Sequence, residues 1–419
     1  MTGPVLQRRI GLRDAVLIGL GSMIGAGVFA APGPAAAAAG SWLPLCVLLA
    51  GAVAWCNATS SARLAAVHPQ AGGTYAYATV RLGPVWGHLA GWSFLVGKTA
   101  SCAAMAITAG AYAWPANPRA AALAVLAVMV GLGTGGVVRG LRLTRVLVAV
   151  ALVALAVVVA AGLAAGPAGP AEPAAAQARP ADGVPLRGVL EGAGLMFFAF
   201  AGYARITTLG EEVVDPARTI RRAVARSLAA VVVLYLVVTG VALYALGPQG
   251  LAGAVAPLAE VVAAAGWEQA GPVVRVCAVA ASTGALLALL LGVSRTAFAM
   301  ARDGHLPGPL VGVRRGVPYR AELAVGAVVA VLVMVGDLRG AIGFSSFGVL
   351  VYYLLAQLSA RRLGPDEGAP PRWVPVVGGV GCAVLALTLG ASSVGWGVAV
   401  LLAGAVAGRI TVRRGQRLP

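Results

Sequence analysis

Two short stretches place glycine among apolar residues, where a lipid-buried helix would otherwise be regular. The first is GLGSMIGAGVF, Gly19 to Phe29, with four glycines in eleven residues. Each glycine costs a helix interior about 1 kcal/mol relative to alanine. The second is FFAFAGYARITTLGEE, Phe197 to Glu212, where a glycine and an arginine interrupt an apolar run. Backbone N–H and C=O groups released at such breaks can bind a ligand at membrane depth.

The groups released by these breaks suit a zwitterion. A helix that restarts near Gly25 to Gly27 presents free N–H groups and its positive dipole end to a carboxylate. Carbonyls near Ser22 and Met23, and near Phe200 to Gly202, can accept hydrogen bonds from an ammonium group. Apolar and aromatic side chains, including Phe197, would surround the rest of the ligand. The predicted binding residues are Ser22, Met23, Ile24, Gly25, Ala26, Gly27, Phe198, Phe200, Ala201, Gly202 and Tyr203.

Helix packing is the alternative explanation for the first stretch. Gly21 and Gly25 lie one turn apart, which is typical of small residues at contacts between membrane helices. The second break, five predicted spans later, favours binding instead. Corresponding breaks at this interval are expected of secondary transporters built from inverted repeats.

Two basic residues lie inside predicted spans. Lys98 is the single lysine among the 31 basic residues. Unlike arginine, a buried lysine can lose its proton near neutral pH, so we predict a coupling role for it. Lys98 lies roughly 10 Å of helix inward from Gly91 and Trp92, which makes snorkelling to the interface awkward. Arg205 stays charged, and we interpret it as a gating or structural residue.

Composition assigns the chain to the membrane. Hydrophobic residues make up 59% and charged residues 11% of 419 positions, and the mean hydropathy is +0.88. Apolar runs of about 17 to 25 residues predict about twelve transmembrane helices. These predicted spans lie near residues 15–39, 43–66, 84–113, 119–137, 144–165, 187–210, 222–246, 271–298, 321–336, 340–359, 373–390 and 393–408.

The basic residues predict the orientation of the chain. Of the 31 basic residues, Arg119, Arg179, Arg187, Arg275 and Arg339 fall outside and two are intramembrane, which leaves 24 on the inner side. This bias places both termini in the cytoplasm of a multi-pass protein of the cytoplasmic membrane. The first span resembles a twin-arginine signal, but eleven spans follow it, so we expect it to be retained. The Pro- and Ala-rich run from Gly166 to Gly183 is predicted to be an external loop.

Other functional classes find little support. The net charge of +17 comes from short groups between apolar runs rather than one basic face, so no nucleic-acid partner is expected. The three histidines lack metal-ligand spacing and the carboxylates cluster in loops, so we expect neither an enzyme nor a metal site. Five cysteines lie in apolar runs and are expected to be buried: Cys46, Cys56, Cys102, Cys277 and Cys382.

Four stretches together resemble the amino acid, polyamine and organocation (APC) transporter superfamily. Two are the interrupted stretches described above, the second continued through VVDPARTIRRAV. The others are PQAGGTYAYATVRLGPVWGHLAGW, Pro69 to Trp92, and SRTAFAMARDGHLP, Ser294 to Pro307. The resemblance implies an all-α membrane fold of two five-helix inverted repeats with broken first and sixth helices. The repeats would cover about 15–165 and 187–359, within a single domain, with two extra helices over about 373–408.

The resemblance implies secondary transport of amino acids or related amines through the lipid bilayer by alternating access, without a cofactor. Members often carry a carboxylate in span six, where this chain has Ala204, so neutral amino acids are favoured over cationic amino acids or polyamines. Proton-coupled members commonly use a lysine in span five, where this chain has Ala151. A proton acting through Lys98 is the expected coupling ion. Sodium at Ser282 and Thr283 is the alternative, and a non-transporting amino acid sensor is the alternative of another class.

Overall fold

The backbone of this chain is organised almost entirely as helix. A computed structural model describes residues 10–68, 72–136, 141–168, 185–207, 213–314 and 316–415. Within these ranges the chain forms no sheet, and the strand-like pairings are the isolated bridges of Ile10 with Val213 and Arg314 with Val317. Within a helix, backbone N–H and C=O groups bond to each other, as lipid requires, except at the helix ends. The predicted all-α membrane class is therefore confirmed.

The helices have the following bounds in chain order. They are α1 (Leu12–Met23), α2 (Ala26–Ala30), α3 (Pro32–Ala39), α4 (Leu43–Val67), α5 (Thr74–Leu82), α6 (Pro84–Ala113), α7 (Pro118–Thr134), α8 (Leu141–Ala165), α9 (Leu186–Phe200), α10 (Ala204–Thr207), α11 (Pro216–Gly253), α12 (Pro257–Ala264), α13 (Gly271–Arg302), α14 (Tyr319–Val335), α15 (Leu338–Ala360), α16 (Trp373–Thr388) and α17 (Ala391–Gly415). The 3-10 turns are η1 (Gly40–Trp42), η3 (Ala201–Tyr203), η4 (Glu268–Ala270), η5 (Gly308–Val311) and η6 (Pro365–Glu367).

Each predicted span coincides with one helix or with a broken helix. Among the described residues, eight stretches are long and apolar enough to cross a membrane, or nine if the bent pair α16 and α17 forms one span. Two of the eight contain the predicted breaks: Leu12–Ala30 joins α1 to α2, and Leu186–Thr207 joins α9 to α10. The broken first and sixth helices are therefore confirmed, while the inverted repeat stays a prediction. The predicted loop from Gly166 to Gly183 lies outside the described residues beyond Ala168.

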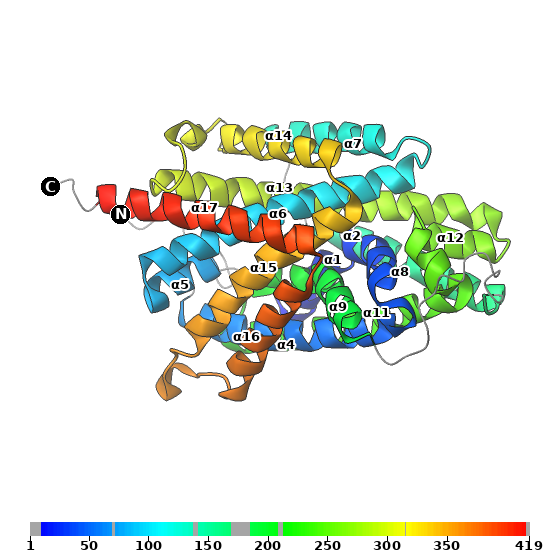
Figure 1. Ribbon diagram of the computed structural model, residues 1–419, viewed down its shortest axis with the longest axis horizontal. Helices are drawn as coiled ribbons and strands as arrows, with labels where there is room; N and C mark the ends of the chain where they lie inside the picture. Colours follow the sequence, from blue (N-terminus) through cyan, green and yellow to red (C-terminus); the bar gives the residue numbers. More distant parts are fainter. Residues whose placement is uncertain are drawn as a thin grey trace.

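Several long helices, among them α6, α13 and α17, run along the molecule, and α15 and α16 cross them obliquely (Figure 1). α6 lies in the interior and packs against α13 and α15, while α7 and α14 pack together along one edge. α5 lies near one end of the bundle and α12 near the other. α6 is largely buried, with 78% of its most apolar stretch enclosed by the rest of the protein. α6 therefore forms a central wall for whatever lies between these helices.

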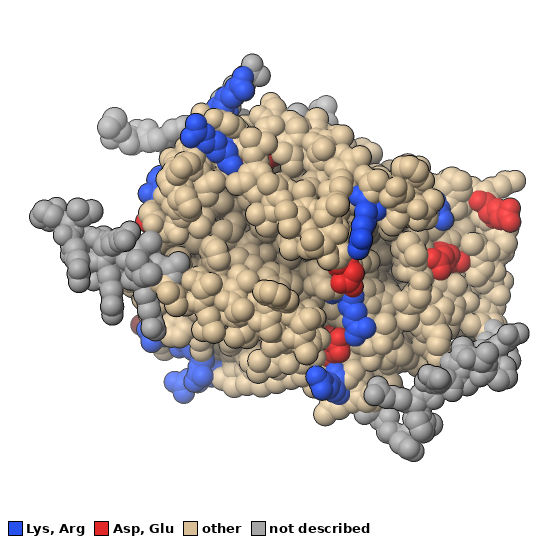
Figure 2. Space-filling view, turned by 45° about the horizontal axis from the view of Figure 1, so that its top comes forward, with Lys and Arg blue, Asp and Glu red and all other residues tan. Residues whose placement is uncertain are grey.

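The surface and the core agree with a lipid environment. On the face seen in Figure 2, charged side chains are few and other residues form most of the surface. Large apolar side chains such as Leu387, Trp396 and Val335 are strongly exposed, which suits contact with lipid tails. All five cysteines are buried, as predicted.

Candidate functional site

The first helix break lies inside GLGSMIGAGVF, where it was predicted. α1 ends at Met23, and Ile24 still donates its N–H to the Leu20 carbonyl at 2.7 Å. Gly25 then leaves the helical region, with φ −80° and ψ −135°, and α2 restarts at Ala26. The Ala31 N–H bonds to the Gly27 carbonyl at 2.9 Å, so the helix runs on into α3. The new helix therefore begins inside the bundle, and the N–H groups of its first turn have no partner within the helix and no side-chain cap.

The second break is narrower than the first. α9 ends at Phe200, and the 3-10 turn η3 connects it to α10. Ala201, with φ −62° and ψ −4°, and Ala204, with φ −53° and ψ −27°, stay near helical geometry. The chain thus tightens its pitch here instead of opening over several residues.

The glycines of the two stretches let the two breaks touch. A Cβ added at Gly27 would lie 2.5 Å from the Ala199 Cα, and one added at Gly202 would collide with the Ser22 carbonyl oxygen. A Cβ at Gly25 would lie 2.8 Å from the Ala285 Cβ of α13. Such approaches admit glycine alone. Close packing therefore accounts for part of the glycine content, alongside the predicted ligand contact.

A tyrosine outside both stretches holds the breaks together. The Tyr235 hydroxyl, from α11, donates to the Met23 carbonyl at 2.6 Å and also lies 3.2 Å from the Ala199 carbonyl. Tyr235 is fully buried, and its ring packs edge-on against Phe200 at 5.1 Å between centroids. One lone pair of the Met23 carbonyl, predicted to face an ammonium group, is thus already used.

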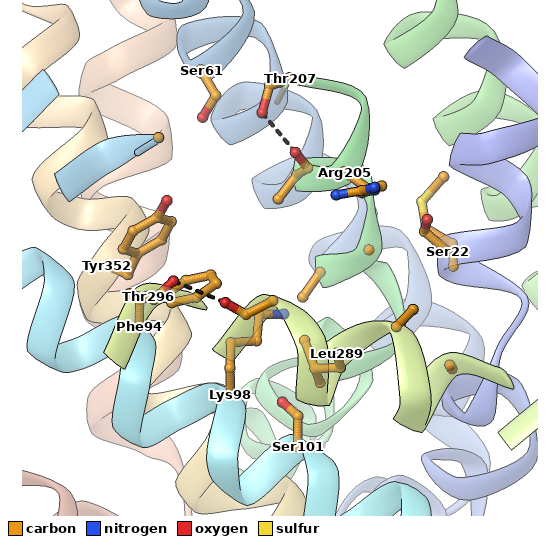
Figure 3. A pocket seen from close by; sticks show the side chains of 18 of the residues that line it. Ser22, Ser61, Phe94, Lys98, Ser101, Arg205, Thr207, Leu289, Thr296 and Tyr352 are labelled. Atoms are coloured by element: carbon orange, nitrogen blue, oxygen red, sulfur yellow. Dashed lines mark hydrogen bonds between the residues drawn. The ribbon is translucent and has the colours of Figure 1, made fainter. Parts of the chain in front are cut away.

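Beside the breaks lies a cavity of about 600 Å³, within the range of small-molecule sites, roughly 300 to 1,000 Å³. It extends from α1, α2, α9 and η3 past α6, α13 and α15 to α5 and Ile10. Figure 3 shows Ser22 and Arg205 on one side of it and Lys98, Phe94 and Tyr352 on the other. The cavity therefore joins the helix breaks to the end of the bundle that carries α5.

The cavity contacts some of the predicted binding residues and not others. Ser22, Met23, Ala26, Gly27, Phe198, Ala201, Gly202, Lys98 and Arg205 line it. The remaining predicted residues do not line the cavity: Ile24, Gly25, Phe200, Tyr203, Ser282 and Thr283. Tyr203, for example, is fully buried and lies against Tyr353 at 5.1 Å between ring centroids.

The basic side chains decide the charge of the cavity. Lys98 extends from α6 toward α13 (Figure 3) and is only 8% exposed. It makes no hydrogen bond or ion pair with any described residue. Arg205 and Arg295 also line the cavity, and none of the described lining residues is an Asp or Glu. The lining is therefore electropositive.

The two residues of the sodium alternative differ. The Ser282 hydroxyl is fully buried and has no partner among the described residues. Ser282 stands next to Ala281, whose carbonyl lies near Gly25. Thr283 instead donates to the Val279 carbonyl of its own helix at 2.8 Å. Ser282 alone offers a free hydroxyl near the first break.

Three groups of lining residues were missed at the sequence level. α13 contributes Ala285, Ala288, Leu289, Gly292 and Thr296, α15 contributes Tyr352 and Tyr353, and α5 contributes Thr74, Tyr75 and Tyr77. The α13 set repeats every three or four residues, a signal that could have marked one helix face. The tyrosines carry no such local signal, because only the packing of distant helices brings them to the cavity.

A buried tyrosine of α6 contacts the helix that follows the first break. Tyr112 of α6 meets Phe29 of α2 edge-on at 5.7 Å between ring centroids. Its hydroxyl accepts the Leu258 N–H of α12 at 3.1 Å and lies 3.4 Å from the Phe29 carbonyl. Tyr112 therefore joins α6, α2 and α12.

A polar network holds α5 at the open end. Arg81 pairs with both carboxylate oxygens of Glu367, and its Nε donates to His68 Nε2 at 3.0 Å. The hydrogen bonds from Arg81 and from the Gly364 N–H lower the pKa of Glu367. Burial, and then the Arg81 charge, lower the pKa of His68 below its ordinary value of 6.5, while Glu367 opposes this. Deeper in, the Tyr352 hydroxyl accepts the Thr74 N–H at 3.0 Å.

Comparison with known proteins places this architecture among transporters. Residues 14–362 match the amino acid permease family. An uncharacterized transporter of Mycobacterium tuberculosis is 56% identical over 98% of this chain and 94% of its own. A branched-chain amino acid permease of Bacillus subtilis is 25% identical over 92% of this chain and 89% of its own. A vacuolar cationic amino acid transporter of Arabidopsis thaliana is 26% identical over 87% of this chain and 65% of its own.

Proposed function

The chain belongs to the amino acid permease family, and we propose that it carries small neutral amino acids across the cytoplasmic membrane by alternating access. The observation that supports this most is the cavity, which extends from both helix breaks to residues of α5. We infer that it opens to water at α5. Tyr112 joins α6, α2 and α12 on the other side of the first break, and we infer that it closes the path there. A site accessible from one side at a time is what alternating access requires.

The helix breaks supply the groups for a zwitterion. The bare N-terminal end of α2, with Ala26 and Gly27 in the cavity wall, is placed to bind the substrate carboxylate. Carbonyls of Ser22 and of the Phe200 to Gly202 turn, with the second lone pair of Met23, would accept from the ammonium group. The substrate side chain would contact apolar lining residues such as Phe198 and Leu289.

The cavity charge argues against a cationic substrate. Lys98, Arg205 and Arg295 line the cavity, and the described part of the lining has no carboxylate to balance a cation. Two like charges repel strongly where water is scarce. The cationic amino acid or polyamine alternative is therefore disfavoured, although cationic transporters are among the relatives. A zwitterion has no net charge, so the positive charge of the lining opposes its binding less.

Coupling is assigned to a proton at Lys98. Its amine faces the cavity, is nearly buried and has no partner among the described residues, so its charge depends strongly on local water. Binding of substrate and proton are linked if substrate affinity differs between the two protonation states. Sodium at Ser282 is the alternative that follows if Lys98 is not involved.

Orientation follows from charge. The cavity opens beside Ile10 and α5, near basic segments predicted to be cytoplasmic. We propose that both termini lie in the cytoplasm and that the cavity faces inward in this conformation. Cysteine labelling from either side of sealed cells, at a cysteine introduced at Arg81 or at Glu268, tests this orientation. Labelling of the Arg81 position from outside would contradict it.

Purified protein in liposomes tests the function. Uptake or exchange of the twenty amino acids and common polyamines should reveal activity with small neutral amino acids. Binding to the purified protein without uptake or exchange would favour the sensor. Activity confined to arginine, lysine or polyamines would favour the cationic alternative.

A further inference from the structure

A buried carboxyl group away from the cavity has no role in the proposed mechanism. Glu322 lies in the first turn of α14, and its side chain is 0% exposed. Neither carboxyl oxygen has a hydrogen-bond partner among the described residues. An unpaired ionised carboxylate in such surroundings is costly, so the group is stable there while it carries a proton.

The neighbouring helix α7 provides the space for this group. α7 and α14 pack side by side (Figure 1), and Gly133 of α7 lies directly against the Glu322 carboxyl group. A Cβ at Gly133 would collide with Oε1 and would lie 3.3 Å from Oε2. Gly131, two residues earlier, faces open space instead. The absence of a side chain at Gly133 therefore creates the pocket for the carboxyl group.

Among the described residues, the charge that acts on Glu322 comes from a neighbouring helix. Arg295 of α13 is the described charged group that acts on it electrostatically. Among the described residues, α7 offers no titratable side chain after Arg119 at its far end, α6 offers the buried Cys102 thiol in the same core cluster, and η5 offers none. Tyr319 and Arg320 belong to α14 itself, and Arg139 and Arg315 of the adjoining loops lie outside the described residues.

Arg295 connects this carboxyl group to the cavity, because the same side chain lines the cavity wall. When the cavity holds water, the guanidinium is hydrated and Glu322 can remain neutral. When the cavity closes and water leaves, the guanidinium needs an anion, and an ionised Glu322 supplies it. The O–H bond of the carboxyl group breaks as the cavity closes, and the proton leaves with the water that the closing cavity expels.

We propose that Glu322 is a proton-binding site whose occupancy is tied to the opening and closing of the cavity through Arg295. This inference rests on the proposed transport function and deepens its coupling. If the proton affinity of Glu322 differs between the open and closed states, proton binding shifts the equilibrium between these states by the corresponding free energy. Glu322 would thus act beside, or in place of, Lys98.

Three variants test the site in liposomes. Glu322→Gln keeps the size and removes the titration, Gly133→Ala displaces the carboxyl group, and Gly131→Ala is the matched control on the same helix. For Glu322→Gln we expect exchange at equal pH within about twofold of wild type, with accumulation driven by a pH gradient reduced to a ratio of about 1. Gly133→Ala should also weaken this accumulation, whereas Gly131→Ala should behave as wild type. Wild-type accumulation by Glu322→Gln would overturn the proposal.

A second measurement separates this proposal from the transport function. The thermal unfolding midpoint of purified protein is followed from acidic to alkaline pH. If Glu322 binds a proton, the difference between wild type and Glu322→Gln changes with pH. Parallel curves would overturn the proton site even if the protein transports. If the two curves converge or diverge but no amino acid is exchanged, Glu322 still binds a proton and the proposed transport function is wrong.

Discussion

The Tyr235 hydroxyl donates to the Met23 carbonyl at 2.6 Å, at the point where α1 ends. The same hydroxyl lies 3.2 Å from the Ala199 carbonyl of α9. One side chain of α11 therefore spans both helices that the proposed substrate site depends on. Removing the hydroxyl alone leaves the Met23 and Ala199 carbonyls without this donor and keeps the ring in place.

Tyr235→Phe should accordingly weaken both the fold and the site. We expect a loss of about 1 to 3 kcal/mol in the free energy of unfolding, the usual cost of a buried acceptor left unpaired. Exchange should fall further than folding accounts for, because the breaks lose their common anchor. Tyr244→Phe, at a 44% exposed tyrosine of the same helix, is the matched control. Equal behaviour of the two variants would remove the anchoring role.

Replacing Gly25 separates packing from ligand binding. Gly25→Ala places a Cβ 2.8 Å from that of Ala285, which should cost about 1 to 3 kcal/mol of stability. Adding Ala285→Gly removes the contact and should recover part of the lost stability, because glycine in the interior of α13 itself costs about 1 kcal/mol. Exchange should stay impaired in the double variant, and Gly25→Val should abolish binding. If the double variant also regained full exchange, the glycine would serve packing alone.

Lys98→Met should uncouple transport from the pH gradient. The variant keeps much of the side-chain volume but removes the titrating amine. Exchange at equal pH is expected to survive, whereas uptake should lose its pH dependence or fail to concentrate substrate. Accumulation with the wild-type pH profile would contradict the assignment. In that case the coupling site would be Glu322 or, for sodium, Ser282.

The network around Arg81 predicts sensitivity to acid. Because burial and then the Arg81 charge lower the pKa of His68, the folded protein disfavours the protonated imidazole, and the unfolded chain binds more protons. Stability should therefore fall as the pH drops below about 6.5. His68→Gln retains an acceptor for Arg81 and should flatten this part of the pH profile of the unfolding midpoint. An unchanged profile would show that His68 protonation does not act on the fold.

Local sequence was enough to predict the membrane class, the approximate spans and both helix breaks. Clustered glycines weaken a helix wherever they occur, so the break at Gly25 could be predicted from the local sequence. The second break was placed correctly at Phe200 to Gly202, but its tight geometry depends on the contact between Gly202 and Ser22. Interactions between distant segments carry no local signature.

The cavity walls show the same limit. Lys98 was visible as the single lysine in an apolar span, and Arg205 as a charge beside a break. Tyr235 and Glu322 stand in spans whose local pattern is ordinary, and their roles arise from contacts with Met23 and Gly133. Phe200 was predicted at the cavity because it adjoins the break, yet it points into the core against Tyr235.

Counterflow in liposomes tests the central proposal most directly. Liposomes containing the purified protein are loaded with an unlabelled small neutral amino acid such as alanine, and entry of the labelled form is measured at equal pH. We expect rapid entry that excess neutral amino acids inhibit and that arginine, lysine or polyamines do not. Absence of entry for every amino acid, with folded protein confirmed, would contradict it.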